Sequence, residues 1–199
     1  AHGHEPTPRE MARLAEAALF IKAGAGLDPW ADDLLAALGA KRPLVVDASR
    51  GVFGPGEESL GVHYWGHPEK AARAAANILQ GLVMLRPAKE GFFRRNYRAF
   101  SAELDRTAVA LRAEAAGWHY KEVISYSAAF SPLLAYLGLV NLATVEESHE
   151  EEVSPRRLME VISLARARGV KVVVGEATAP RPAAVLAEEI GARVALLWP

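Results

Sequence analysis

Histidines carry the clearest chemical signal in this sequence. Four of the six lie in two close pairs, His2 with His4 and His63 with His67, and each pair stands in a loop just before an expected helix. Neutral imidazoles, together with carboxylates, are good ligands for zinc and other divalent transition metals. The two pairs therefore indicate a metal site, while the alternative is that they are surface histidines without a ligand role.

The second pair opens the stretch around which we organise the rest of the chain. Pro68 suits the first turn of a helix, where a missing N–H costs nothing, and the alanine-rich residues after it have apolar side chains at helical spacing. A loop histidine at the start of a helix, on a rigid scaffold, is a common place for a ligand or a catalytic group. The alternative is that His63 is a structural histidine packed on Tyr64 and Trp65.

Three further residues are weaker candidates. His149 lies in the acidic run 146–152, which is typical of a solvated face. We interpret His119, which follows Trp118, as structural. Glu176 comes directly after an expected strand, and the carboxyl end of a parallel strand is where α/β proteins bind ligands; its alternative role is to cap loop amides.

Composition narrows the function classes. The chain has 199 residues, of which 51% are hydrophobic, and no cysteine, so disulfides and thiolate metal sites are excluded. A net charge of −1 gives no electrostatic reason to expect nucleic acid or an anionic membrane as a partner. We find no apolar run long enough to span a bilayer, no signal peptide and no nucleophile elbow, phosphate-binding loop or His-Glu-x-x-His motif. Because the chain opens without methionine, we expect its N-terminus to be trimmed or incomplete.

Short apolar runs alternate with amphipathic segments along the chain, which predicts an α/β fold with mostly parallel sheets. Turn and cap residues place the boundaries; Thr7, for example, can form a capping box with Glu10. We expect strands at 18–21, 44–48, 122–126, 140–145, 170–174 and 194–197, and helices at 8–17, 29–38, 68–86, 91–116, 128–137, 155–168 and 182–190.

The helix expected at 91–116 is long for a small α/β layer. At about 1.5 Å per residue it would be about 40 Å long. One face of this helix is predicted to carry an apolar stripe, made of Phe93, Tyr97, Phe100, Leu104, Ala108 and Leu111. We therefore expect a lobe at 1–90, a connecting helix at 91–117 and a second lobe at 118–199; the alternative is a long helix packed on a single domain.

Several segments, in this order, resemble the solute-binding proteins of bacterial zinc and manganese ABC importers. Residues 1–8, with His2 before Glu5-Pro6-Thr7-Pro8, resemble the family's first metal-ligand loop, and residues 18–27 resemble the strand and turn after it. Residues 62–68 resemble the Pro-His-x-Trp-x-Asp-Pro loop that carries the second ligand. The helix at 96–116 resembles the family's inter-lobe helix, and residues 154–176 follow the pattern of its second lobe.

The resemblance implies two α/β lobes with mostly parallel sheets, joined by a long rigid helix. It implies a protein that is not an enzyme, that captures a zinc or manganese ion between its lobes and that delivers the ion to an ABC permease. Such a protein is periplasmic or extracellular, peripheral to the membrane, in some members lipid-anchored, and monomeric, with no nucleic-acid partner. By the family pattern His2 and His63 take the first two ligand positions.

The sequence also departs from the family pattern. The third ligand position falls on Ser127, the fourth falls at Trp198 or beyond the last residue, and the aspartate of the second loop is His67. We therefore expect a metal set of His2, His63 and His67, with His4 as a further substitute. About one βαβ unit of the first lobe and the final helix are expected to be missing.

Two other readings stay open. The chain could be a family member that has lost its metal site and binds another solute or acts as an adaptor, which Ser127 and Trp198 favour. The other reading is a flavodoxin-like α/β enzyme that uses the strand ends near Glu176.

Overall fold

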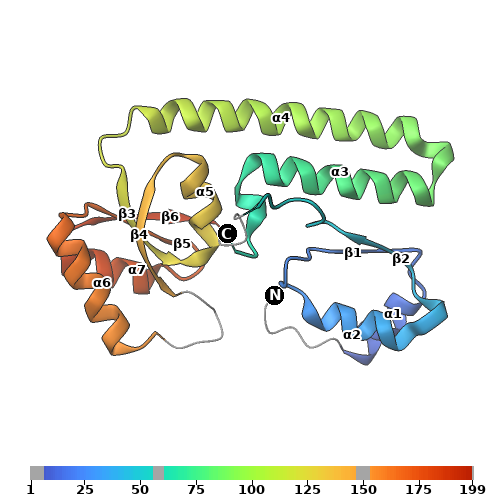
Figure 1. Cartoon of the computed structure of the whole chain (residues 1–199), viewed down its shortest axis with the longest axis horizontal. Helices are drawn as coiled ribbons and strands as arrows, with labels where there is room; N and C mark the ends of the chain where they lie inside the picture. Colours follow the sequence, from blue (N-terminus) through green and yellow to red (C-terminus); the bar gives the residue numbers. More distant parts are fainter. Residues whose placement is uncertain (1–6, 56–60, 147–152, 199) are drawn as a thin grey trace. The chain divides into compact units, whose positions relative to one another are not determined.

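The computed structural model describes residues 7–55, 61–146 and 153–198. Backbone contacts divide the chain into two units, Ala1–Thr107 and Ala108–Pro199. Each unit holds its own parallel sheet with helices against it (Figure 1). The predicted α/β fold with parallel sheets and a long helix is confirmed. No helix within the described residues is long and apolar enough to cross a membrane.

Unit 1 is built on two parallel strands, with Leu19 paired to Leu44. One face of the pair packs on Leu14, Leu34 and Leu35 from two short helices, and the other packs on a longer helix. The elements are α1 (Pro8–Ala15), β1 (Leu19–Lys22), α2 (Pro29–Leu38), β2 (Leu44–Asp47) and α3 (Pro68–Leu85).

The start of α1 confirms the predicted capping box. The amide of Glu10 donates to Thr7 Oγ1 at 3.3 Å, and the Thr7 amide donates back to Glu10 Oε2 at 2.8 Å. These bonds satisfy two amides at the helix start and fix where it begins.

Helix α3 lies against β2 at a glycine. A Cβ built on Gly81 would stand 2.1 Å from Val46 Cγ2, and Val46 is itself buried. Because valine has a single stiff χ1 angle, its methyl group cannot move aside without strain. Gly81 is therefore what lets α3 approach the strand this closely, and α3 is the helix that follows the His63–His67 loop.

We expect Gly81→Ala to lower the free energy of unfolding by about 1–2 kcal/mol, although alanine is the better helix former by about 1 kcal/mol. Gly91→Ala is the matched control, because its Cβ would meet only the flexible end of Arg95 at 3.7 Å. Urea denaturation followed by circular dichroism measures both variants. Equal stability of the two would contradict the close packing of α3 on β2.

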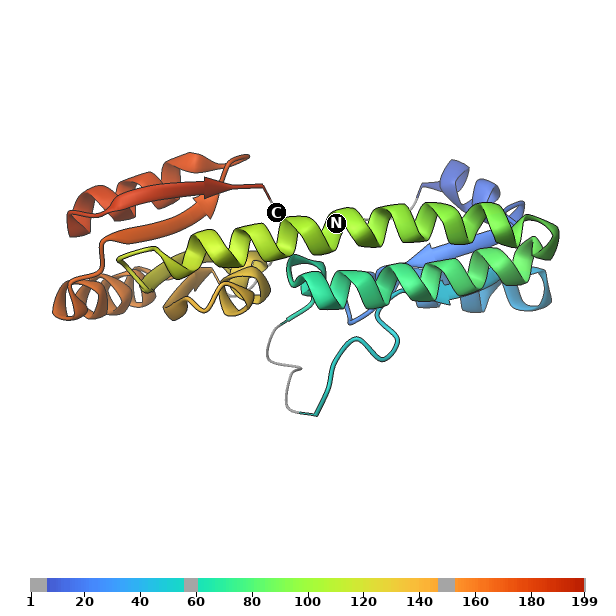
Figure 2. The same cartoon turned by 90° about the horizontal axis from the view of Figure 1, so that it is seen from above.

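The long helix, α4, spans Glu90–Ala116 and follows a short 3-10 turn. Its predicted apolar stripe is only partly buried: Ala108 is buried, but Phe100 is 49% exposed and Leu111 is 36% exposed. Within unit 1, Phe93 and Tyr97 face α3 across a cavity of about 310 Å³. Figure 2 shows α3 running alongside the first half of α4. The apolar spacing from Phe93 to Leu111 therefore continues beyond the part of α4 that packs on α3.

Unit 2 contains a four-stranded parallel sheet in the order β4-β3-β5-β6. Helices α6 and α7 cover one face, and α5 packs on the other. The elements are β3 (Glu122–Ser127), α5 (Ser131–Tyr136), β4 (Val140–Glu146), α6 (Pro155–Arg168), β5 (Val172–Glu176), α7 (Pro180–Ile190) and β6 (Arg193–Leu197).

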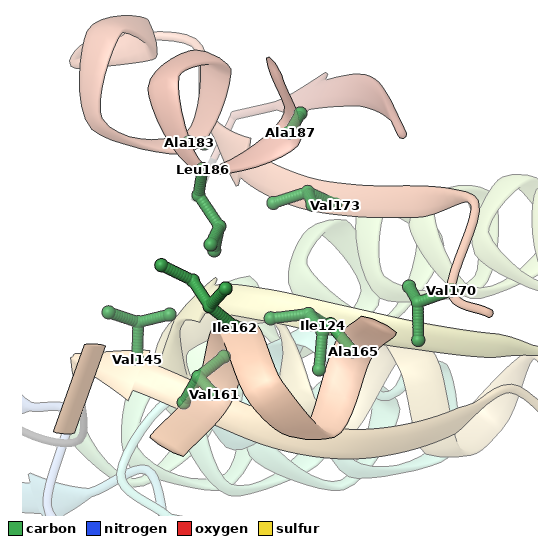
Figure 3. Close-up of a cluster of buried hydrophobic side chains, with 10 residues drawn as sticks. All are labelled: Ile124, Val145, Val161, Ile162, Ala165, Val170, Val173, Ala183, Leu186 and Ala187. Carbon is green, nitrogen blue, oxygen red and sulfur yellow. The ribbon is translucent and has the colours of Figure 1, made fainter. Parts of the chain in front are cut away.

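The main core of unit 2 lies between the sheet and its two helices (Figure 3). Ile124 and Val173 contribute from neighbouring strands and are fully buried. The fifth strand begins at Val172, two residues later than predicted. Val170 instead closes the end of α6, since its amide donates to Ala165 O at 2.9 Å after Gly169 has turned left-handed. A buried apolar residue in that position is typical of a helix end, and periodicity alone does not separate it from a strand start.

Candidate metal-binding site

The structure places two of the three predicted ligands. His63 and His67 flank one 3-10 turn, η3 (Tyr64–Gly66), directly before α3. His2 lies outside the described residues, as do His4 and His149.

His63 is half-buried, and its ring stands edge-on to Trp65, with 5.4 Å between ring centroids and 71° between planes. Its carbonyl oxygen accepts the Gly66 amide at 3.1 Å, which closes the turn. Packing of this kind suits a structural histidine and also restricts the ring for a ligand role, so both alternatives from the sequence fit the geometry.

His67 occupies the N-cap position of α3. Its amide donates to Tyr64 O at 3.0 Å, and its carbonyl accepts the Ala71 amide at 2.9 Å. Its Nδ1 atom is screened from solvent. The backbone of this residue is thus fixed from both sides, by η3 and by the first turn of α3.

Tyr64 ties the turn to the end of β1. Its side chain is 2% exposed, packs edge-on against Phe53 at 5.9 Å, and donates its hydroxyl to Ala23 O at 2.7 Å. Burial, with a smaller contribution from the charges of Asp47 and Asp28, raises the pKa of Tyr64 to about 12. The phenol therefore stays protonated, and a hydrogen-bond donor, throughout the physiological range.

Asp28 and Ser49 hold the turn that accepts this hydroxyl. The Asp28 carboxylate accepts the amides of Ala23 and Gly24 at 2.7 and 2.9 Å, and Ser49 Oγ accepts the amide of Ala25 at 3.0 Å. Three successive residues, Gly24 to Gly26, have positive φ angles. Such a backbone persists only where the surroundings fix it.

Two side chains of α3 hold the loop that follows β2, and the sequence analysis singled out neither. Asn77 Nδ2 donates to the carbonyls of Ala48 and Arg50 at 3.0 and 2.8 Å. Lys70 is 5% exposed and donates to Val52 O at 3.2 Å. The sequence does not show that Lys70 holds this loop. Lysine at the start of a helix is usually exposed, and its acceptor here is a backbone carbonyl, which every residue carries.

In unit 2, Ser127 stands at the carboxyl end of β3, where the resemblance places a third ligand. It is 2% exposed, and its hydroxyl accepts the Ala129 amide at 3.3 Å. Its carbonyl accepts the Ser125 hydroxyl at 2.6 Å. The Ser127 side chain is therefore used to cap the short turn after the strand. The resemblance puts the fourth ligand at Trp198 or beyond the last residue, and Trp198 is 77% exposed and has no atom suited to bind a metal.

Two carboxylates accompany Ser127 at this edge of the sheet. Glu146 ends β4 and pairs with Ser127 in the register, and Glu176 ends the neighbouring β5. The hydroxyl of Thr178 donates to Glu176 Oε2 at 3.3 Å, and the capping of loop amides by Glu176 stays a prediction. Burial and the charge of Glu146 raise the pKa of Tyr126. The sequence places Glu146 in the acidic run 146–152, and its pairing with Ser127 is a long-range contact that this local pattern does not mark.

No three histidine, aspartate or glutamate side chains within residues 7–55, 61–146 and 153–198 come together in an arrangement that could hold a metal ion. The described residues thus contribute two imidazoles on one loop, and His2 belongs to the part of the chain outside them.

Comparison with known proteins agrees with the resemblance. The family model described as ZnuA, zinc-uptake complex component A, periplasmic, matches residues 1–199. The high-affinity zinc uptake system protein ZnuA of Bacillus subtilis is 27% identical over 98% of the chain and 67% of its own length. The iron-binding protein YfeA of Yersinia pestis is 25% identical over 96% of the chain and 64% of its own length. The chain therefore spans about two thirds of these relatives.

Solved structures match as well. A zinc-bound variant of AdcAII from Streptococcus pneumoniae superposes with a TM-score of 0.84 and 26% identity, over 100% of the chain and 76% of that structure. Similarity at this level covers all the elements described above.

Proposed function

Because the chain belongs to the ZnuA family of metal-uptake solute-binding proteins, we propose that zinc is the ion it carries and that His63 is a ligand. The observation that supports this most strongly is the position of His63. A half-buried imidazole stands on a turn that is tied to β1 and leads into α3. Residues 62–68 resemble the family's second ligand loop, and the chain as a whole matches the family.

We propose His2 and His67 as further ligands. His2 precedes the segment that begins α1, and His67 is held at the start of α3 by backbone hydrogen bonds on both sides. Ser127 is not proposed, since its hydroxyl already caps the turn after β3.

Zinc is favoured over manganese by the ligand chemistry. Imidazole nitrogen suits zinc, whereas manganese prefers carboxylate and carbonyl oxygen, and zinc binds more tightly than manganese to most sites of this kind. The proposed set is made of imidazoles only. Relatives of the chain bear names that refer to zinc and to iron, so the choice of metal needs a direct test.

The test offers both metals together. Protein stripped with a chelator is incubated with equal concentrations of zinc and manganese and desalted, and its metal content is measured by mass spectrometry. We expect one equivalent of zinc and little manganese. Preferential retention of manganese would overturn the choice of zinc, and retention of neither would overturn metal capture and favour a member that has lost its site.

The affinity for zinc is expected to depend on pH. Only the neutral imidazole binds metal, so protons compete as the pH falls through about 6.5. Between pH 7.5 and 5.5 we expect a loss of about tenfold for each ligating histidine, measured by competition with a chelator of known pH dependence. An affinity that is constant over this range would contradict histidine ligation.

We also propose that the protein works outside the cytoplasmic membrane and passes its ion to an ABC permease. The family description names a periplasmic component of an uptake complex. A direct measurement is transport of radioactive zinc by membrane vesicles that contain the permease, with and without this protein.

A further inference from the structure

Tyr64 lies in the histidine loop, but its side chain points away from the loop into the interior of unit 1. The phenol is 2% exposed and reaches the turn just after β1, where its hydroxyl donates to Ala23 O at 2.7 Å. Residues 23 and 64 are far apart in the sequence. This hydrogen bond is therefore a tertiary contact that fixes the turn from outside.

The acceptor of that bond does not depend on Tyr64 for its own position. Asp28 accepts two successive amides of the same turn, at 2.7 and 2.9 Å, including that of Ala23 itself. Ser49 holds the next amide and also donates to Asp47 Oδ1 at 2.7 Å. Ala23 O thus belongs to a turn that is already held in place, and it can serve as a fixed point for the histidine loop.

Main-chain hydrogen bonds of η3 link the position of Tyr64 to the positions of both histidines. The carbonyl of Tyr64 accepts the amide of His67 at 3.0 Å, and the carbonyl of His63 accepts the amide of Gly66 at 3.1 Å. On the other side the ring of Tyr64 packs edge-on against Trp65 at 5.3 Å, and Trp65 in turn packs against the ring of His63. A shift of Tyr64 would therefore move His63 through the main chain and through the indole.

We propose that Tyr64 is a positioning residue of the metal site, whose hydroxyl holds the His63 loop in its metal-binding arrangement before the ion arrives. This inference rests on the proposed function. Holding a ligand in place beforehand reduces the ordering that binding must otherwise supply. Loss of the Tyr64 hydroxyl should therefore weaken metal binding while the aromatic ring keeps its place in the core.

Tyr64→Phe tests this, because it removes the hydroxyl and retains the ring. Outer hydrogen bonds of metal sites contribute about 10- to 100-fold when they touch the ligand itself. Since Tyr64 acts through the backbone, we expect the Kd for zinc to rise by about three- to tenfold. Tyr97→Phe, in the same unit on α4, is the matched control and should leave the Kd unchanged.

Phe53→Leu separates positioning from general loosening. It removes one of the two aromatic packing partners of Tyr64 and leaves the hydroxyl with its acceptor. We therefore expect a lower melting temperature of the metal-free protein and a Kd for zinc near that of the wild type. The cobalt-loaded proteins give a second readout, since the visible absorption of cobalt depends on how its ligands are arranged. We expect the spectrum to change in Tyr64→Phe and not in Tyr97→Phe.

Three results decide the matter. If wild-type protein binds zinc and Tyr64→Phe binds it with the same Kd and the same cobalt spectrum, the positioning role is overturned and the proposed function stands. If Phe53→Leu weakens binding as much as Tyr64→Phe does, the effect follows stability and the role is likewise overturned. If wild-type protein itself binds no zinc, the proposed function fails first.

Discussion

Replacing His63 by alanine is expected to weaken zinc binding by about 100-fold or more, because removal of a direct ligand should cost at least as much as the largest effects of its outer partners. The affinity is measured by competition with a chromogenic chelator at pH 7.5. His63 is half-buried beside Trp65, so circular dichroism should accompany the titration to show that the variant is folded.

His119→Ala is the control for that experiment. His119 is exposed, packs on the ring of Tyr120 at 4.9 Å and lies in unit 2. The His119→Ala protein should bind zinc with the same affinity as the wild type. A folded His63→Ala protein with wild-type affinity would assign His63 to the structural role and remove it from the metal site.

The second large effect is expected at Gly24. Its φ is +75°, and a Cβ there would stand 2.0 Å from Asp47 Oδ1 and 2.4 Å from Ser49 Oγ. Asp47 Oδ1 accepts the amide and the hydroxyl of Ser49, which in turn accepts the amide of Ala25. We expect Gly24→Ala to lower the free energy of unfolding by about 2–4 kcal/mol, as the sum of a left-handed backbone penalty and steric overpacking.

Gly26→Ala distinguishes these two contributions. Gly26 has φ of +82° and no atom within 4 Å of its ideal Cβ, so it should show only the backbone penalty of about 1–2 kcal/mol. Both variants are compared by thermal and urea unfolding. If the two lose the same stability, the network of Asp47 and Ser49 is not rigid in solution.

The sequence predicted most of the elements because their ends carry local signals. Thr7 with Glu10, and Ser154 with Pro155, mark helix starts that the structure confirms. The predicted helix at 29–38 has the observed bounds, Pro29–Leu38. Local signals failed where a long-range contact decides. Val170 looks like a strand residue but packs at a helix end, and Phe100 follows the apolar spacing of its helix but is 49% exposed.

Less of the site than of the fold could be predicted from the sequence. The spacing of His63 and His67 with Trp65 identified the loop, and the resemblance gave it a role. Two contacts across unit 1 support the site: Tyr64 to Ala23 holds the histidine loop, and Asn77 to Ala48 holds the loop after β2. Both acceptors are main-chain carbonyls, which every residue carries, so nothing in the sequence marks them.

Isothermal titration of chelator-stripped protein with zinc measures directly whether the chain captures this metal. We expect saturable binding of one zinc ion per chain at pH 7.5. No binding of zinc, with manganese also failing to bind when it is titrated next, would contradict it and would assign the chain to family members that have lost the metal site.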